Sequence, residues 1–196
     1  MNHAHHQHGF RPAADAPLRA VQDAFLLWAG EQDERHELVG GAIIMMSPVN
    51  RAHAVLTVRL IAALARQLDS DRYDVTGPDF GVRTHRGIRS PDVMVDARAP
   101  SNSRAAEAPI LIGEVLSPSS VAVDMVEKVA EYTALASLQV YLVFSQDEPR
   151  AWVWRRNDGG RFPDAPAMVS GADAILAVDA LGANLSFAEI YRGLGA

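Results

Sequence analysis

The chain has 196 residues, of which 48% are hydrophobic and 21% charged, as in an ordinary globular domain with a sizeable core. It contains no cysteine, which excludes disulfides and thiolate metal sites. Its net charge of −6 argues against a strong general affinity for nucleic acid, because such affinity usually needs a basic face. No apolar run comes near the roughly 20 residues that span a bilayer, and the N-terminus lacks an apolar signal region. We therefore expect a cytoplasmic protein without a membrane partner.

The first 14 residues differ in composition from the rest, with four histidines among the first eight. Imidazole suits transition metals, but a short biased tract of this kind is typical of a flexible tail. We expect residues 1–14 to be a disordered histidine-rich tail without a role. Residues 15–196 are expected to form a single domain.

A helix and a hairpin are predicted at the start of this domain. The helix begins near Asp15, because Pro17 suits its first turn. The hairpin follows in the run HELV–GG–AIIMM, where Gly40 and Gly41 form a favourable two-residue turn.

A second helix and several strands are predicted next. Asn50 suits the N-cap of a helix that extends to about Leu68. Strands are expected at residues 74–76 and 80–84, and a flexible loop at residues 97–108. The apolar face of the helix is expected to hold Val55, Val58, Ala62 and Ala65.

The C-terminal part is expected to add a hairpin, an edge strand and a short helix. QVYLVF and RAWVWRR read as paired strands, and Trp152 and Trp154 share a face suited to core or interface packing. Residues 157–174 are predicted to be irregular, because they contain several Gly and Pro. ILAVDA is expected to be a closing edge strand and SFAEIYRGL a terminal helix.

The chemistry concentrates between Ser90 and Tyr132, where two carboxylates lie in apolar, strand-like runs. Asp92 follows Pro91, which favours a strand start, and Glu114 lies in APILIGEVL. In a strand, Glu114 shares a face with Ile110, Ile112 and Leu116. Burying an unpaired carboxylate costs on the order of several kcal/mol, so each acid needs a cation, a metal or hydrogen-bond donors beside it. If the two strands are neighbours, both acids can converge at one end of the sheet.

A lysine follows on a predicted helix. At 3.6 residues per turn, the apolar stripe holds Lys128 together with Tyr132, while Glu131 lies opposite. Lys128 in this stripe needs an anion, which favours a shared metal-and-water site with the two acids. In the alternative interpretation, Asp124 and Lys128 form a surface pair worth about 0.2–0.5 kcal/mol. The other residues of the apolar stripe are Val121, Met125 and Leu135. The opposite side of the helix holds Glu127 and Ala134 together with Glu131.

Arginines precede the first acid. Arg83, Arg86 and Arg89 form a basic run before Asp92 that would hold a substrate phosphate beside the metal. The alternative is a solvated loop, which is common for arginines near glycine.

These motifs resemble a known family. SPDVMV, PILIGEVLSPSS, the spaced Asp124, Lys128 and Tyr132, and VYLVF are similar to the Uma-type restriction endonucleases of the PD-(D/E)XK nuclease superfamily. The resemblance extends upstream to RHELVGGAIIMMSPVNRAH and downstream to FAEIYRGL, and so covers nearly all of the chain after Pro17.

The resemblance implies a fold and a set of roles. The expected fold is α/β (mixed α+β), with a restriction-endonuclease-like αβββαβ core and a mixed central sheet flanked by helices, plus the N-terminal helix and hairpin. Asp92 and Glu114 match the metal ligands, for Mg²⁺ or Mn²⁺, and Lys128 the catalytic lysine. Glu37 matches an acid of the hairpin motif that approaches the metal, and His53 matches the family's histidine. Asp124 and Tyr132 complete the set.

Two departures from the superfamily pattern stand out. The lysine of the (D/E)XK motif would fall at Leu116, so the next helix has to supply it. The hairpin turn, usually flanked by acids, is here Gly40–Gly41–Ala42.

The function implied is a metal-dependent endonuclease that hydrolyses phosphodiester bonds of nucleic acid, with DNA the expected substrate. A homodimer would suit the cutting of two strands. One alternative is a nuclease-fold module that binds or regulates without catalysis, favoured by the acidic balance and the altered turn. Another is a purely structural network of buried acids and lysine.

Overall fold

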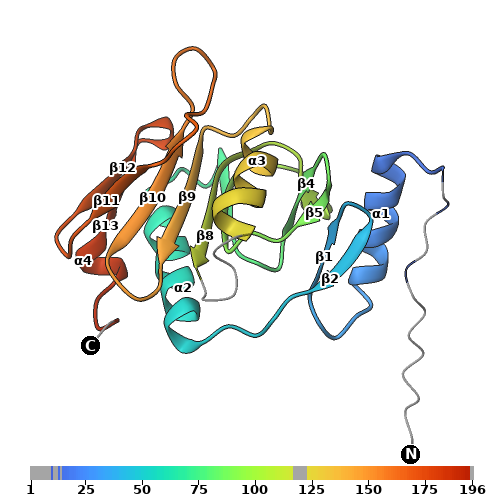
Figure 1. The fold of residues 1–196 in the computed structure, drawn as a ribbon, viewed down its shortest axis with the longest axis horizontal. Coiled ribbons are helices and arrows are strands. Elements are labelled where there is room, and N and C mark those ends of the chain that lie inside the picture. The colour runs from blue at the N-terminus through green and yellow to red at the C-terminus, as the bar shows by residue number, and fades with distance from the viewer. Residues whose placement is uncertain (1–9, 11–12, 14, 117–122, 195–196) are drawn as a thin grey trace, which may run out of the picture.

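A mixed six-stranded sheet forms the centre of the molecule (Figure 1). The computed structural model describes residues 10, 13, 15–116 and 123–194. Strands β3, β6 and β8 are antiparallel, β8 and β9 are parallel, and β9, β10 and β11 are again antiparallel. The strands in spatial order are β11 (Ala167–Ser170), β10 (Arg150–Arg155), β9 (Val140–Ser145), β8 (Pro109–Leu116), β6 (Val93–Ala97) and β3 (Tyr73–Thr76).

Strand β8 lies in the interior of this sheet, between β9 and β6, and helices cover the sheet on both faces. Its odd-numbered side chains, Leu111 and Val115, pack in the core that α2 (Arg51–Ala65) covers. Its even-numbered side chain Ile112 packs on the other face, in a core with Tyr132 of α3 (Lys128–Thr133). With the strands of the second sheet set aside, the order α2–β3–β6–β8–α3–β9 is the αβββαβ core that the resemblance implies.

A second sheet lies beside the first. It has five strands in the order β2 (Ala42–Met45), β1 (His36–Val39), β5 (Gly87–Arg89), β4 (Gly81–Thr84) and β7 (Ala105–Ala106). Helix α1 (Leu18–Ala29) packs on one face through Phe25, against Leu38 and Ile88. Phe10, in the predicted tail, stacks edge-on against Phe25 with ring centroids 5.9 Å apart.

Glycines permit two tight features of this sheet. Gly40 and Gly41 have φ of 59° and 86°, which confirms the predicted two-residue turn between β1 and β2. At Gly87 a Cβ atom would lie 1.9 Å from the Leu38 carbonyl oxygen, so only glycine lets β5 approach β1.

The C-terminal region differs in part from the prediction. Strand β12 (Ile175–Val178) pairs with β13 (Ala183–Ser186) in a separate two-stranded sheet and does not close the main sheet. The 3₁₀ turn Asp179–Leu181 joins them, and α4 (Phe187–Ile190) follows. Strand β11 lies within the region predicted to be irregular, where its backbone pairs with β10. Trp154 is buried beside Tyr141, which confirms core packing for this face of β10.

The predicted face of α2 was wrong. Asn50 caps the helix as predicted, since its Oδ1 accepts a hydrogen bond of 2.9 Å from the His53 N–H. Val58 is 64% exposed, however, and the leucines of the neighbouring face are buried instead. Burying a leucine removes more apolar area from water than burying Ala or Val, so the larger side chains turn inward. The buried apolar residues are Leu56, Leu60, Ala63 and Leu64. In the described part of the chain, no helix is long and apolar enough to cross a membrane.

Candidate active site

Glu114 lies at the centre of the candidate site, on β8, and is 3% exposed. Its Oε1 accepts a hydrogen bond of 2.9 Å from Lys128 Nζ and one of 3.0 Å from the Tyr132 hydroxyl. Lys128 and Tyr132 are four residues apart on α3, so both point from one helix face to the sheet. The structure therefore brings Lys128 to Glu114, and Tyr132 joins them from the same helix stripe.

Lys128 is distinctive in this chain. It is the only lysine, whereas the other 17 basic residues are arginines. It is buried, at the start of α3 directly after the π-helical turn Val123–Glu127. The lysine ammonium is a compact point charge, whereas an arginine guanidinium is planar and binds a carboxylate through two N–H groups. The chain therefore places its compact cation beside Glu114.

Asp92 immediately precedes β6, the strand beside β8. Val93 pairs with Gly113 across β6 and β8, and one further step of this antiparallel register puts Asp92 opposite Glu114. Asp92 Oδ2 accepts a hydrogen bond of 2.8 Å from the Val115 N–H. The two strands are thus neighbours, as predicted, and the two acids occupy the same end of the sheet.

His53 supports Asp92 from the first turn of α2. Its Nε2 lies 3.2 Å from Asp92 Oδ2, and the imidazole is 6% exposed. The contacts found for Asp92 in the described part of the chain use Oδ2 alone. Among the described residues, Asp92 Oδ1 is therefore the candidate ligand atom.

Arg89 forms a clamp that the sequence did not predict. Its Nε and Nη2 donate to Glu131 Oε2 at 2.9 and 2.8 Å, and its Nη1 donates to Glu37 Oε2 at 2.9 Å. Glu37 Oε1 also accepts from the Ser90 N–H, and Glu131 Oε1 accepts from the Thr84 hydroxyl. Burial by itself lowers the pKa of Arg89, but the hydrogen bonds and charges of Glu131 and Glu37 outweigh it and raise the pKa above its ordinary value. We call Glu37, Arg89 and Glu131 the arginine clamp.

The clamp changes two expectations. Glu131, predicted to lie opposite Lys128, is buried at 1% exposure, because α3 contacts the second sheet as well as the first. Arg89, expected to hold a substrate phosphate, is 3% exposed and engaged by two carboxylates. The sequence held one signal for the position of Glu131. It follows Lys128 by three residues, and residues i and i+3 are neighbours on a helix surface.

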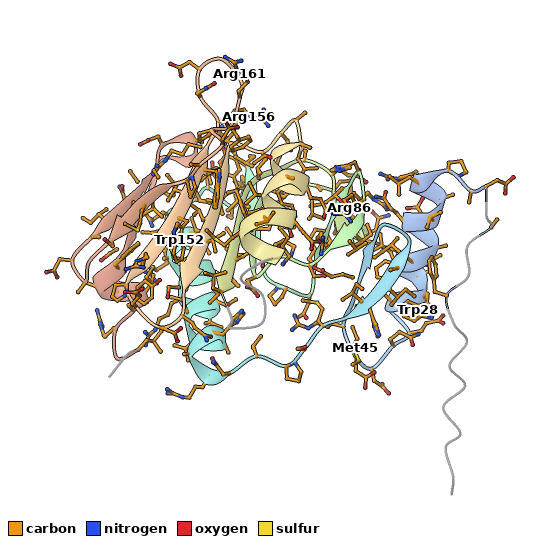
Figure 2. All side chains as sticks on the ribbon, viewed as in Figure 1. Trp28, Met45, Arg86, Trp152, Arg156 and Arg161 are labelled. Carbon is orange, nitrogen blue, oxygen red and sulfur yellow. The ribbon has the colours of Figure 1, made fainter. Side chains whose placement is uncertain are left out.

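The other predicted phosphate contacts lie elsewhere. Arg83 pairs with Asp23 of α1 at 2.5 Å and with Glu107 at 3.0 Å, so its guanidinium turns toward α1. Arg86 lies at the turn between β4 and β5, where its side chain is 41% exposed and its Nη1 is 4.0 Å from Glu127 (Figure 2). Of the three arginines, Arg86 alone presents a half-exposed cation.

Part of the predicted motif lies outside the described residues. Residues 117–122 include the Ser-Pro-Ser-Ser segment that follows Leu116. The backbone of Asp124 belongs to the π-helical turn, but its side chain also lies outside the described set. Its expected pairing with Lys128 stays a prediction.

The donor chemistry of the site fits a hard divalent cation. Asp92 and Glu114 together with the arginine clamp comprise four buried carboxylates and the two cations Arg89 and Lys128, a formal excess of two negative charges with His53 counted as neutral. Buried charge of one sign is costly unless a counter-ion offsets it. No group of three or more His, Asp or Glu side chains close enough to hold a metal occurs among the described residues. Mg²⁺ is commonly held by only one or two carboxylates with water and substrate oxygens, and Asp92 and Glu114 match that requirement. The four carboxylates are Glu37, Asp92, Glu114 and Glu131.

Tyr132 gives the site a measurable pH dependence. Burial raises the pKa of its hydroxyl well above the ordinary value, and the charges of Glu114 and Glu37 raise it further. Because the folded pKa exceeds the unfolded pKa of about 10, the stabilisation is complete below about pH 10 and is lost as pH rises above it. We expect Tyr132→Phe to make stability fall less steeply above about pH 10, by up to roughly 1.4 kcal/mol per pH unit. Urea unfolding across this range measures it, with the half-buried Tyr73→Phe as control; equal slopes for wild type and Tyr132→Phe would contradict it.

The candidate site thus combines two acids from adjacent strands with a lysine from the helix that follows. A solved structure from Anabaena variabilis, described as a putative nuclease belonging to DUF820, superposes with a TM-score of 0.70. The match covers 88% of this chain and 98% of that one, at 17% sequence identity. This likeness confirms the predicted mixed α/β fold.

Sequence comparison establishes the family. The profile of the Uma2 family, described as "Putative restriction endonuclease", matches residues 22–188, and the chain belongs to this family. The uncharacterized protein slr1290 of Synechocystis is 29% identical over 187 residues, covering 93% of this chain and 96% of the relative. A second uncharacterized protein of Synechocystis, sll1609, is 30% identical over 119 residues, covering 58% of this chain and 67% of the relative.

Proposed function

We propose that this protein is a metal-dependent endonuclease that hydrolyses phosphodiester bonds in DNA. The proposal is supported by the buried Lys128–Glu114 ion pair and by the position of Asp92 at the same end of the neighbouring strand. The family description supports nuclease activity, and the words "restriction endonuclease" favour DNA over RNA.

Asp92 and Glu114 would hold Mg²⁺ or Mn²⁺, both of which prefer oxygen ligands. Such an ion, when bound, acidifies a water molecule and offsets the charge that grows on the scissile phosphate. The protein fixes both carboxylates beforehand. The Val115 N–H and His53 hold Asp92, and Tyr132 and Lys128 hold Glu114.

Lys128 would supply the positive charge at the reaction centre. Its ammonium is 2.9 Å from Glu114 Oε1 and has three donors. A cation fixed in a dry site stabilises developing phosphate charge without reorganising. Lys128 would therefore orient the attacking water or stabilise the pentavalent phosphate.

A non-catalytic binding module is the second candidate. It is favoured by the absence of a third metal-ligating side chain among the described residues and by the Gly40–Gly41–Ala42 turn. Such a module would bind nucleic acid without cutting it.

A cleavage screen separates the two functions. Single- and double-stranded DNA and RNA are incubated with Mg²⁺, Mn²⁺ or chelator, using wild type and Glu114→Gln. We expect DNA cleavage that needs the metal and is lost in Glu114→Gln, because the amide is a neutral and weaker metal ligand. Cleavage at the wild-type rate by folded Glu114→Gln would refute the assignment, and binding without cleavage would establish the module.

A further inference from the structure

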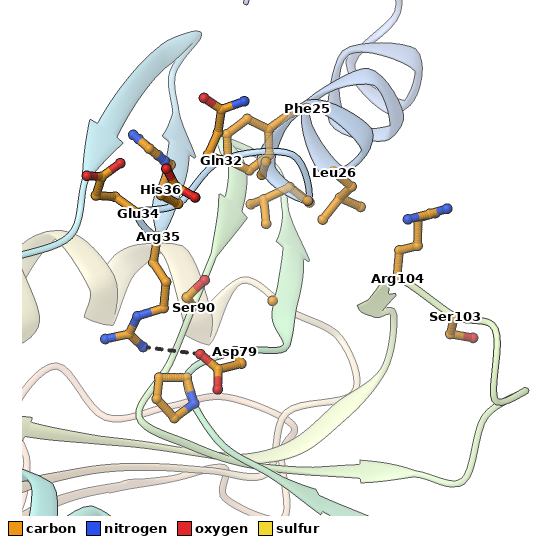
Figure 3. A pocket seen from close by; sticks show the side chains of 16 residues that line it. Phe25, Leu26, Gln32, Glu34, Arg35, His36, Asp79, Ser90, Ser103 and Arg104 are labelled. Atoms are coloured by element: carbon orange, nitrogen blue, oxygen red, sulfur yellow. Dashed lines mark ion pairs between the residues drawn. The ribbon is translucent and has the colours of Figure 1, made fainter. Parts of the chain in front are cut away.

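A cavity of about 410 Å³ lies on the α1 side of the second sheet, and its lining does not include Lys128. It is formed by the C-terminal half of α1, the loop that follows it and the ends of β4 and β5 (Figure 3). Its volume falls within the about 300–1,000 Å³ of small-molecule pockets. The site described above makes no use of this cavity.

The cavity has one apolar and one polar side. The partly exposed Leu26, Ala29 and Pro78 give it an apolar side, while Phe25 and Ile88 also line it but are only 1% exposed. Figure 3 shows Phe25 and Leu26 on one side and Arg35 and Asp79 on the other. An apolar wall facing a few polar groups suits a flat ring with donors and acceptors on its edge.

The charges of the lining argue against a phosphate and for a neutral group. Three acids and the two cations Arg35 and Arg104 leave one formal negative charge. Arg35 Nη1 and Asp79 Oδ1 are 3.8 Å apart, and the Asp79 side chain is 92% exposed. An exposed pair at this distance is weak, so a ligand can separate it and engage both groups. The three acids are Asp33, Glu34 and Asp79.

The cavity is next to the candidate active site along the chain. Ser90 lines it and is two residues from Asp92, which corresponds to about 7 Å of extended backbone. Glu37 accepts the Ser90 N–H at 2.9 Å and so fixes this connection. Successive stacked nucleotides rise about 3.4 Å, so the backbone of Ser90, at one edge of the cavity, lies within about two nucleotide steps of Asp92.

From these features we propose that the cavity binds an unpaired purine base near the cut, guanine in preference, an inference that rests on the proposed endonuclease function. Guanine offers two N–H donors on one edge to the Asp79 carboxylate, and its O6 accepts from the Arg35 guanidinium. Adenine lacks that pair of donors. The cavity admits one base and no duplex, so the base enters from a single strand or after leaving the stack.

Free nucleotides test the proposal without any cleavage. Calorimetry and ligand-observed NMR measure the dissociation constants of dGMP, dAMP, dCMP and dTMP in the absence of metal. We expect dGMP to bind at least about fivefold more tightly than dAMP, and Asp79→Asn to weaken dGMP at least about fivefold. Ala29→Phe should abolish binding, because Ala29 lines the cavity and a phenyl ring would fill it. Glu31→Gln, exposed on the same loop but outside the lining, should bind like wild type.

Each outcome decides the proposal. Equal binding of all four nucleotides, no binding of dGMP at millimolar concentration, or unchanged dGMP binding in folded Asp79→Asn and Ala29→Phe would overturn it. Metal-dependent cleavage without dGMP binding would leave the proposed function intact and remove the base site. Selective dGMP binding without cleavage would leave the site intact and remove the endonuclease.

Discussion

Replacing Arg89 by methionine is expected to lower the free energy of unfolding by about 3–5 kcal/mol. Arg89 is 3% exposed and makes three hydrogen bonds to the carboxylates of Glu37 and Glu131, which are themselves buried. Methionine fills much of the same volume but leaves both carboxylates without their cation. Removing one partner of a buried ion pair is costly mainly because the remaining charge stays buried.

Urea unfolding of Arg89→Met and of Arg98→Met measures this difference. Arg98 also pairs with an aspartate, but its side chain is 56% exposed and that of Asp71 is 92% exposed. Exposed pairs contribute about 0–1 kcal/mol, so the control should lose little stability. A triple variant with Glu37→Gln and Glu131→Gln should recover part of the loss. A loss below about 1 kcal/mol in Arg89→Met would show that the clamp does not stabilise the fold.

Replacing Lys128 by methionine is expected to lower the cleavage rate by about 10²–10³-fold, the cost of losing one preorganised charge at a reaction centre. Metal binding should not weaken, because the substitution removes a positive charge beside Glu114 and leaves both carboxylates. A lower cleavage rate together with undiminished metal affinity distinguishes a catalytic lysine from one that only holds the metal site together.

Single-turnover cleavage and Mn²⁺ calorimetry on the same preparations give the two quantities. Lys128→Arg, which keeps the charge but changes its shape, should retain more activity than Lys128→Met. Thermal unfolding of each variant checks that the fold persists. Cleavage by folded Lys128→Met at the wild-type rate would remove Lys128 from the mechanism, and loss of Mn²⁺ binding would assign it a structural role in the metal site.

Patterns within single elements predicted most of the central fold. Glu114 lies in an eight-residue apolar strand, and Asn50, Gly40 and Gly41 mark a cap and a turn through their own conformational preferences. Lys128 and Tyr132 meet Glu114 because helical periodicity places them on one side of α3. All these signals act over a few residues, which is the range at which a sequence pattern is informative.

Contacts between distant segments were not predictable in this way. Arg89 is 52 positions from Glu37 and 42 from Glu131, and its basic neighbours Arg83 and Arg86 suggested a phosphate contact instead. Nothing in the local sequence shows that α3 lies between two sheets, so Glu131 was placed with the solvent-facing residues. The resemblance to the nuclease superfamily pointed to the acids before β6 and on β8 and to the lysine on α3, but it carried no information about the clamp.

The most direct test of the shared site uses the single lysine of the chain. Protein labelled with ¹³C at the lysine ε-carbon gives one side-chain signal, which reports on Lys128 alone, and paramagnetic Mn²⁺ broadens the signals of nearby nuclei. We predict that one equivalent of Mn²⁺ broadens this signal in the wild type, and that Asp92→Asn removes the effect although Asp92 is on a different strand. Mn²⁺ that binds without changing the lysine signal, or that broadens it equally in folded Asp92→Asn, would contradict a metal site shared by Asp92, Glu114 and Lys128.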